Sequence, residues 1–186
     1  MNYHISTGLI LQNFNPKSEC PLCEIRQIVE RNTVDQFLNE AVMIDSARDK
    51  ANKKGFCAHH YDMMINRQNK LGVALQTMTR LDKTLMNIIE PPKNYKTAVK
   101  QAEELKKCLS TCLICDLIDD NMERYYKTVA QMYYNEPSFR DILLSTKGFC
   151  LNDYIGLLRH TNEAKSKADE YVKTLGELQV KNMERM

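Results

Sequence analysis

The chain has little of the two residues on which tight turns depend. It contains only 6 Gly and 5 Pro among 186 residues. Hairpin-rich folds use both residues repeatedly, so their scarcity argues against such a fold. The abundant residues are Leu, Lys, Glu, Met, Gln and Ala, which favour helices. The sequence therefore predicts an all-α protein, a helical bundle with little or no sheet.

Long apolar runs are also absent. No stretch approaches the ~18 uninterrupted apolar residues that a transmembrane helix needs. Residues 1–14 contain the short apolar run Gly8 to Leu11, but no Lys or Arg precedes it and no small-residue cleavage site follows it. A signal peptide is therefore not expected. We expect a cytoplasmic protein that has no membrane partner.

The chain lacks a strong net charge of either sign. Its 26 basic and 24 acidic residues leave a formal charge of +2. This balance creates no general attraction to phosphate backbones or acidic membranes. The basic clusters Lys53-Lys54 and Lys106-Lys107 are short and have no aromatic residues interleaved with them. Nucleic acid is therefore not an expected partner, whereas an unidentified protein partner stays open.

Common catalytic signatures are missing too. The chain has no Gly-rich loop that would cradle a phosphate, no G-x-S-x-G and no H-E-x-x-H. His4 and His160 stand alone, and we interpret them as solvated or core residues. The sequence predicts no catalytic residue.

What the chain does have is seven Cys at repeating intervals. An offset of 92 or 93 residues aligns CPLC at 20–23 with CLIC at 112–115, and GFC at 55–57 with GFC at 148–150. Self-similarity of this kind indicates an internal duplication. Because a reducing cytoplasm keeps thiols free, we interpret these Cys as metal ligands or redox groups rather than disulfides.

The duplication predicts the organisation of the chain. We expect a single domain over residues 1–186, made of two pseudo-symmetric tandem repeats at about 15–90 and 107–180. A helix is expected to start at each C-x2-C pair. Thr33 and Gln36 have the form of a capping box, which predicts the start of a second helix in the first repeat.

Each repeat is predicted to end in a long amphipathic helix. In the first, apolar residues recur at spacings of three and four: Leu71, Leu75, Met78, Leu81, Leu85 and Ile88. Pro91-Pro92 ends this helix. The second runs from Tyr154 toward Glu184. We interpret both stripes as ordinary core and expect the two helices to pack together, although the stripe on the last helix would serve a dimer as well.

The first repeat supplies a candidate metal site, made of Cys20, Cys23, Cys57 and His60. Zinc prefers four tetrahedral ligands drawn from thiolate and imidazole, and two short pairs brought together by folding commonly supply them. If each pair lies at the start of a helix, the positive end of the helix dipole lowers the thiol pKa and favours the thiolate. His59 has the wrong spacing for a ligand, and we expect it in solvent or behind His60.

The second repeat supplies Cys112, Cys115 and Cys150, with Asp153 where the first repeat has His60. Three alternatives are open at this site. Asp153 completes a site of three thiolates and a carboxylate, which zinc accepts. Alternatively, Cys108 supplies the fourth ligand. In the third alternative the site holds no metal and its thiols are simply buried.

The paired pattern resembles that of an uncharacterised bacterial family, a domain of unknown function. Its members carry a C-P-x-C pair followed by G-F-C-x-x-H, twice over, and the similarity covers about residues 1–180. The resemblance implies a helical, metal-binding protein from a bacterium, with no established activity. The family pattern has a His at the position of Asp153 and a Pro at that of Leu113, so both departures fall in the second site.

These observations lead to one hypothesis and two alternatives. The leading hypothesis is a non-enzymatic binding or adaptor protein stabilised by zinc, with one site expected to hold the ion and the second open. The first alternative is a thiol-based redox or metal sensor that uses the second Cys cluster. The second alternative is an enzyme whose second site binds a catalytic zinc if Asp153 turns away.

Overall fold

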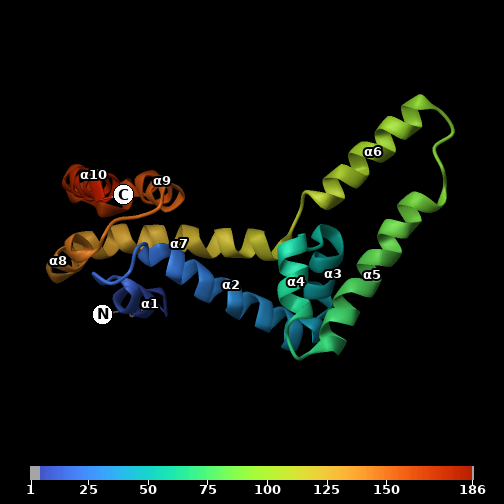
Figure 1. Cartoon of the computed structure of the whole chain (residues 1–186), viewed down its shortest axis with the longest axis horizontal. Coiled ribbons are helices and arrows are strands. Elements are labelled where there is room, and N and C mark those ends of the chain that lie inside the picture. Colours follow the sequence, from blue (N-terminus) through green and yellow to red (C-terminus); the bar gives the residue numbers. More distant parts are fainter. Residues whose placement is uncertain (1–4, 186) are drawn as a thin grey trace. The chain divides into compact units, whose positions relative to one another are not determined.

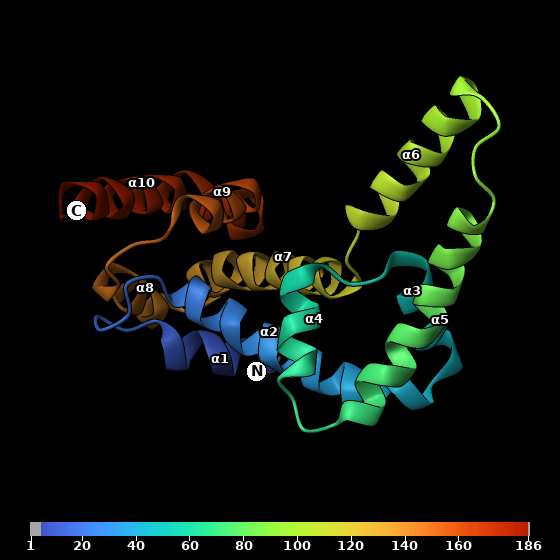
Figure 2. The same cartoon turned by 45° about the vertical axis from the view of Figure 1, so that its right-hand side comes forward.

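The computed structural model describes residues 5–185, and within this range the chain is helical with no strand (Figures 1 and 2). The all-α prediction is confirmed. The elements, in order, are α1 (Ile5–Asn13), α2 (Pro21–Asn39), η1 (Ala41–Met43), α3 (Asp45–Lys54), α4 (Ala58–Ile65), α5 (Lys70–Ile89), α6 (Tyr95–Leu109), α7 (Leu113–Asn135), α8 (Pro137–Ser145), α9 (Leu151–Arg159), η2 (Thr161–Lys167) and α10 (Ala168–Arg185). Of the helices described, none has the length and apolar character needed to cross a membrane.

The helices form two compact units. The first unit comprises Met1–Val29 and Asp119–Met186, and the second comprises Glu30–Ile118. Helices α2 and α7 therefore each contribute residues to both units. The unit boundaries do not coincide with the predicted repeats, and the single domain and the duplication stay predictions.

The core of the first unit is aromatic. Phe14 lies with its ring 5.7 Å from that of Phe139 and 6.0 Å from that of Phe149. In the same unit, Tyr133 and Tyr171 have ring centroids 4.9 Å apart, and both are fully buried. Aromatic pairs at these distances add to the free energy of burial. Helices α1, α7, α8 and α10 are held together through this core.

The second unit has a smaller core, whose centre is Phe56. Its ring contacts those of Phe37 and Tyr61, at centroid distances of 6.0 and 5.5 Å. Arg80 on α5 donates to the carbonyls of Asn52 and Cys108, at 2.9 and 3.2 Å. These carbonyls belong to the last turns of α3 and α6, where a cation is favourable. One guanidinium thus joins three helices.

Three helical predictions are wrong. The last helix, predicted to run from Tyr154 toward Glu184, is divided into α9, η2 and α10. Lys165 within η2 has a φ of +51°, which a helix does not allow.

Helix α2 runs without interruption through Thr33 and Gln36, so the predicted capping box does not start a helix. The apolar face of α2 continues past this point, with Val34 and Leu38 buried, and this packing keeps the helix intact. The stripe of α5 is not core either, because all of its large apolar residues are at least 37% exposed. The stripe of α10 is the one that enters a core, through Tyr171 and its neighbours.

Gly55 directly follows α3, and Gly148 lies between α8 and α9, and at both positions the backbone requires a residue without a side chain. Their φ angles are +70° and +117°, values that other residues rarely adopt. A Cβ atom at Gly148 would lie 2.7 Å from Cβ of Asn182, whose amide donates to the carbonyl of Phe149 at 3.1 Å. The repeated K-G-F-C sequence is therefore a turn that leads a Cys to the start of the next helix.

Replacing Gly148 by Ala should lower the free energy of unfolding by about 1–3 kcal/mol, because the new Cβ needs a strained backbone and displaces Asn182. Urea unfolding followed by circular dichroism measures the change. Gly176→Ala on α10 is the matched control, since nothing lies within 4 Å of its Cβ position. That variant should gain about 0.5–1 kcal/mol from helix propensity. Equal effects of the two substitutions would contradict this account of the turn.

Candidate metal centres

The four cysteine-containing pairs all lie at helix starts, as the sequence predicts. The first Cys of each pair directly precedes a helix, and its carbonyl accepts the hydrogen bond that closes the first turn: Cys20 for α2, Cys57 for α4, Cys112 for α7 and Cys150 for α9. The second ligand of each pair follows three residues later, on the same side of that turn. Each pair can therefore present two donors to one point.

The structure brings the four pairs together in two groups. The Cys–His cluster consists of Cys57, His60, Cys112 and Cys115, and the Cys–Asp cluster consists of Cys20, Cys23, Cys150 and Asp153. Within each group the ligand atoms all lie within 4.8 Å of one another. The Cys–His cluster lies in the second unit and the Cys–Asp cluster in the first.

This grouping corrects the prediction that Cys20 and Cys23 converge with Cys57 and His60. Each C-x2-C pair instead meets the C-x2-H or C-x2-D pair of the other predicted repeat. Helix lengths explain the error. Helix α2 has 19 residues and α3 has 10. These correspond to about 28 and 15 Å, so α3 cannot return the chain to the start of α2.

In the Cys–His cluster, the imidazole nitrogen Nδ1 of His60 faces the sulfur atoms. It lies 3.2 Å from Sγ of Cys57, 3.3 Å from that of Cys112 and 3.5 Å from that of Cys115. The sulfur atoms of Cys57 and Cys115 are 3.9 Å apart. Ligand bonds of ~2.0 to 2.3 Å in a tetrahedron place donors ~3.5 to 3.8 Å apart, so these four atoms fit one zinc-sized ion.

Glu30 orients this imidazole. The Nε2 atom of His60 lies 3.1 Å from Oε1 of Glu30, and the same oxygen is 2.9 Å from Nε2 of His59. Metal-binding imidazoles are commonly held by such a carboxylate on their other nitrogen. Burial lowers the pKa of His60 despite the nearby Glu30, which favours the neutral form that binds metal. His59 lies behind His60, as its spacing predicts.

In the Cys–Asp cluster, one carboxylate oxygen of Asp153 takes the place of the imidazole. Oδ2 lies 3.3 Å from Sγ of Cys20, 3.3 Å from that of Cys23 and 3.2 Å from that of Cys150. The sulfur atoms of Cys23 and Cys150 are 3.5 Å apart. The spacing again suits four-coordinate binding, with Asp153 as a ligand through a single oxygen.

The other oxygen of Asp153 is held by two polar groups. Oδ1 accepts from the hydroxyl of Tyr126 at 2.7 Å and from Arg26 at 3.4 Å. Burial alone would raise the pKa of Asp153, but hydrogen bonds from Tyr126 and the thiols outweigh it and lower the pKa. A carboxylate that is 1% exposed thus stays ionised. Gly156 permits this arrangement, because a Cβ there would lie 2.4 Å from the ring of Tyr126.

Burial opposes ionisation of the thiols. It raises the pKa of Cys20 to about 11 and that of Cys115 to about 12, and it raises the pKa of Cys23 as well. The expected lowering by the helix starts is therefore outweighed. A divalent cation has to displace these protons, so metal affinity should fall as the pH falls.

The remaining candidates lie outside both clusters. Cys108, the rival fourth ligand, joins neither group, so that alternative is not supported. His160 pairs with Glu123 and stacks on Tyr126, with ring centroids 6.3 Å apart. His4 lies outside the described residues.

Three residues of these centres were missed by sequence reasoning: Arg26, Glu30 and Tyr126. A helical signal was present, because Arg26 and Glu30 follow Cys23 at spacings of three and then four, and so share its face of α2. Tyr126 lies three turns beyond Cys115 on α7. Nothing in the sequence indicated which cluster each residue would support.

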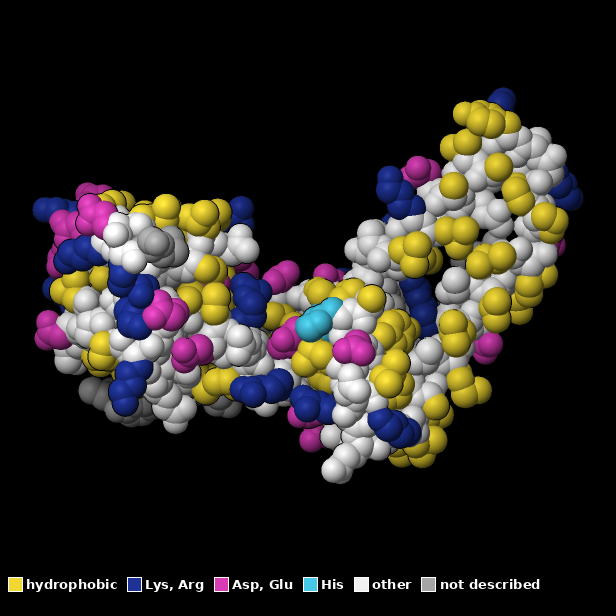
Figure 3. All heavy atoms as spheres, viewed as in Figure 1, with side chains coloured by type: hydrophobic (Ala, Val, Ile, Leu, Met, Phe, Trp, Pro, Cys, Tyr) yellow, Lys and Arg dark blue, Asp and Glu magenta, His cyan; other side chains and the backbone are white. Residues whose placement is uncertain are grey.

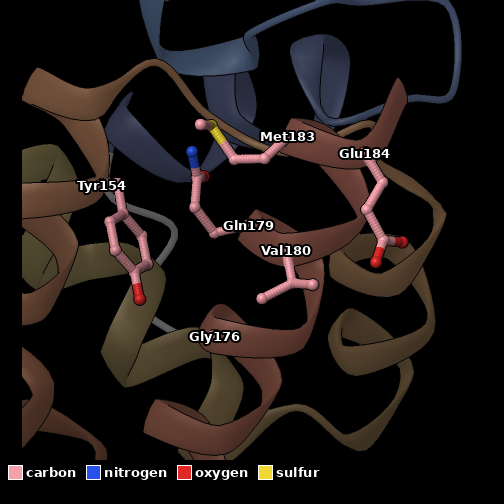
Figure 4. A pocket seen from close by; sticks show the side chains of 6 residues that line it. All are labelled: Tyr154, Gly176, Gln179, Val180, Met183 and Glu184. Carbon is pink, nitrogen blue, oxygen red and sulfur yellow. The ribbon is translucent and has the colours of Figure 1, made fainter. Parts of the chain in front are cut away.

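The first unit also has a shallow hollow that differs from the two clusters, because its lining is mainly apolar. It has a volume of ≈ 470 Å³ and is lined mainly by apolar groups, with Tyr154 on one side and residues of α10 on the other (Figure 4). Val180 and Met183 are both more than half exposed in it. The hollow offers a surface for contact, not a set of converging ligands.

The grouping can be tested by alkylation of the metal-loaded protein. Replacing Cys57 by Ser should expose Cys112 and Cys115 to iodoacetamide, with rates at least tenfold higher, because an ion held by this cluster would lose one of its four ligands. Peptide mass spectrometry measures each site separately. Cys20, Cys23 and Cys150 serve as internal controls and should be unchanged. Faster alkylation of Cys20 and Cys23 in this variant would restore the grouping within repeats.

Comparison with known proteins assigns the chain to a family. No curated protein matches it, and no solved structure does. The model of one family matches residues 1–186, that is, the whole chain. The family resemblance indicated by the motifs is thus confirmed. The chain belongs to the family of unknown function DUF6062.

Proposed function

We propose that this chain is a cytoplasmic, non-enzymatic helical binding or adaptor protein stabilised by two zinc ions. One observation carries the proposal: two separate groups of four donor atoms, each within 4.8 Å, assembled from helix starts that are distant in the sequence. An isolated buried Cys is an ordinary core residue. Six of the seven Cys gathered around one His and one Asp are not explained by packing.

The donor set favours zinc over other common metals. Each cluster offers three sulfur atoms and one nitrogen or oxygen, a soft set that suits zinc in tetrahedral coordination. The hard cations magnesium and calcium bind oxygen ligands in larger numbers. Zinc also has no redox chemistry of its own, so the ion would act by fixing the positions of its ligands.

A structural role follows from the number of protein ligands. A catalytic zinc keeps one position for water or substrate, whereas four protein donors fill a tetrahedron. Asp153 is held by Tyr126 and Arg26 from behind, which opposes the turning away that a catalytic site would need. Each ion would join two helix starts that are connected only through many residues of chain, which restricts the unfolded state.

Protein purified without chelator should contain two zinc ions per chain. Chelation should lower Tm by roughly 8–16 °C for each ion lost, since saturating metal binding contributes about 4 kcal/mol per site. Elemental analysis and thermal unfolding by circular dichroism measure the two quantities. Cys108→Ser is the matched control, because it removes a Cys outside both clusters and should change neither. Protein with no metal and seven freely titratable thiols would overturn the proposal.

A redox sensor at the Cys–Asp cluster is the second candidate. The sulfur atoms of Cys23 and Cys150 are 3.5 Å apart, so a small shift would allow a disulfide. A hollow of ≈ 550 Å³, lined by Arg26 and Tyr126 among others, gives access to the groups behind Asp153. Peroxide would take two electrons from the two thiolates, form the disulfide and be reduced to water, and the zinc would be released.

For the sensor, limited peroxide should release one zinc and form a disulfide that contains Cys150, and dithiothreitol with added zinc should reverse both changes. A chromogenic chelator follows the released zinc, and peptide mapping identifies the bond. Cys150→Ser provides the comparison, because it cannot form this bond. If both clusters lose zinc at the same rate, or neither does, the sensor hypothesis fails.

A further inference from the structure

Helices α5 and α6 form a hairpin whose apolar side chains are exposed. Ten large apolar residues contribute to this surface, here called the hairpin seam: Leu71, Leu75, Met78, Leu81, Leu85, Ile88 and Ile89 of α5 and Tyr95, Val99 and Leu109 of α6. Their exposed fractions run from 37% to 84%. Figure 3 shows hydrophobic side chains along the length of both helices. In α6 no residue is buried at all.

On each helix, the face that carries the seam has the spacing of a coiled coil. In α5 the residues Leu71, Ala74, Met78, Leu81, Leu85 and Ile88 follow one another at intervals of three and four without exception. In α6 the same intervals join Tyr95, Ala98, Ala102, Leu105 and Leu109. A heptad repeat of this kind keeps one face of a helix toward a neighbouring helix over its whole length. Both helices of the hairpin therefore have an apolar face with the spacing that packs against another helix.

We propose that the hairpin seam binds the seam of a second copy of this chain, so that two hairpins form a four-helix bundle. A two-fold axis pairs the same surface on both copies, and a patch with matching heptads on both helices is self-complementary. This proposal goes beyond the proposed function and does not rest on bound zinc.

The exposed area supports a second copy. Ten large side chains that are roughly half exposed leave about 1,000 Å² uncovered per chain, more than the ~800 Å² per partner of a standard interface. Monomers rarely leave an apolar patch of this size in water. The area is therefore sufficient for a stable dimer.

The charges of α5 argue against a membrane as the occupant. Helices that lie on anionic membranes carry many Lys and Arg opposite their apolar face. In the sequence, the face of α5 opposite the seam has a single Lys, Lys83, and its Gln76 and Arg80 are engaged with backbone carbonyls of the same unit. The corresponding face of α6 is of mixed charge, because Glu103 and Glu104 lie among its Lys residues. The seam positions of α5 contain no charged residue, as expected for the centre of a protein interface.

Sedimentation velocity of the full chain, purified without chelator, tests the proposal. At tens of micromolar the protein should sediment with twice the 21.6 kDa mass of one chain. Leu81→Glu places two unpaired carboxylates in the bundle and should raise the dimer Kd by at least about 100-fold. Leu144→Glu on α8 is the matched control, since Leu81 and Leu144 are 54% and 50% exposed. This control should leave the dimer intact.

Two further measurements keep the outcome decisive. Circular dichroism and zinc content should match wild type in Leu81→Glu, and if they do not, Leu85→Gln replaces it as the test. A wild-type monomer, or a dimer that a correctly folded seam variant leaves intact, would overturn the proposal. So would binding of a wild-type monomer to vesicles of phosphatidylcholine and phosphatidylserine that Leu81→Glu abolishes, because the seam would then be a membrane surface.

Discussion

The architecture depends on the convergence of helix starts at the two clusters. A helix start has free N–H groups and a partial positive charge, both of which favour thiolates and other anionic ligands. Here a backbone N–H also donates to sulfur in each cluster, from Cys150 to Cys20 at 3.4 Å and from Cys115 to Cys112 at 3.5 Å. Four helices begin at these points, and their directions are constrained there. Helices α2 and α7 start at these clusters, and buried residues along both helices, such as Val34 and Tyr133, pack in the cores.

The two clusters differ in the partner of their fourth donor, and the difference is chemical rather than geometric. His60 has an acidic partner, Glu30, which can accept a hydrogen bond from Nε2–H, the imidazole nitrogen that faces away from the sulfurs, when Nδ1 is the metal ligand. Asp153 has donors instead, Tyr126 and Arg26, because a carboxylate has only acceptors to offer. In each cluster the groups behind the fourth donor thus match its chemistry, an acceptor behind the imidazole and donors behind the carboxylate.

The helical class, the turns at Gly55 and Gly148 and the eight residues of the two clusters could all be predicted from the sequence, because each depends on local patterns. The grouping of the pairs could not. It depends on the lengths of α2 and α3, and the predicted break at Thr33 gave α2 the wrong length. The roles of Glu30 and Tyr126 could not be predicted for the same reason, since each contacts a ligand on another helix and the helix packing was not known. Similarity between the predicted repeats shows that their sequences are alike. It does not show that the two ligand pairs within one repeat bind the same ion.

The exposed apolar stripe of α5 is a second feature that the sequence pattern alone does not decide. A heptad stripe is equally consistent with a buried core helix and with a helix that meets another chain. The two kinds of helix are distinguished by which face of α5 contacts the rest of its unit. Arg80 and Gln76 bind backbone carbonyls of α3, α6 and α2, and this anchors one edge of α5 while its apolar face stays uncovered. The carbonyl of Cys108 that Arg80 holds lies just before Cys112, so the base of the hairpin and the Cys–His cluster share one short segment. The hydrogen bonds of Arg80 thus tie the hairpin to the segment that leads into this cluster, while its apolar faces stay uncovered.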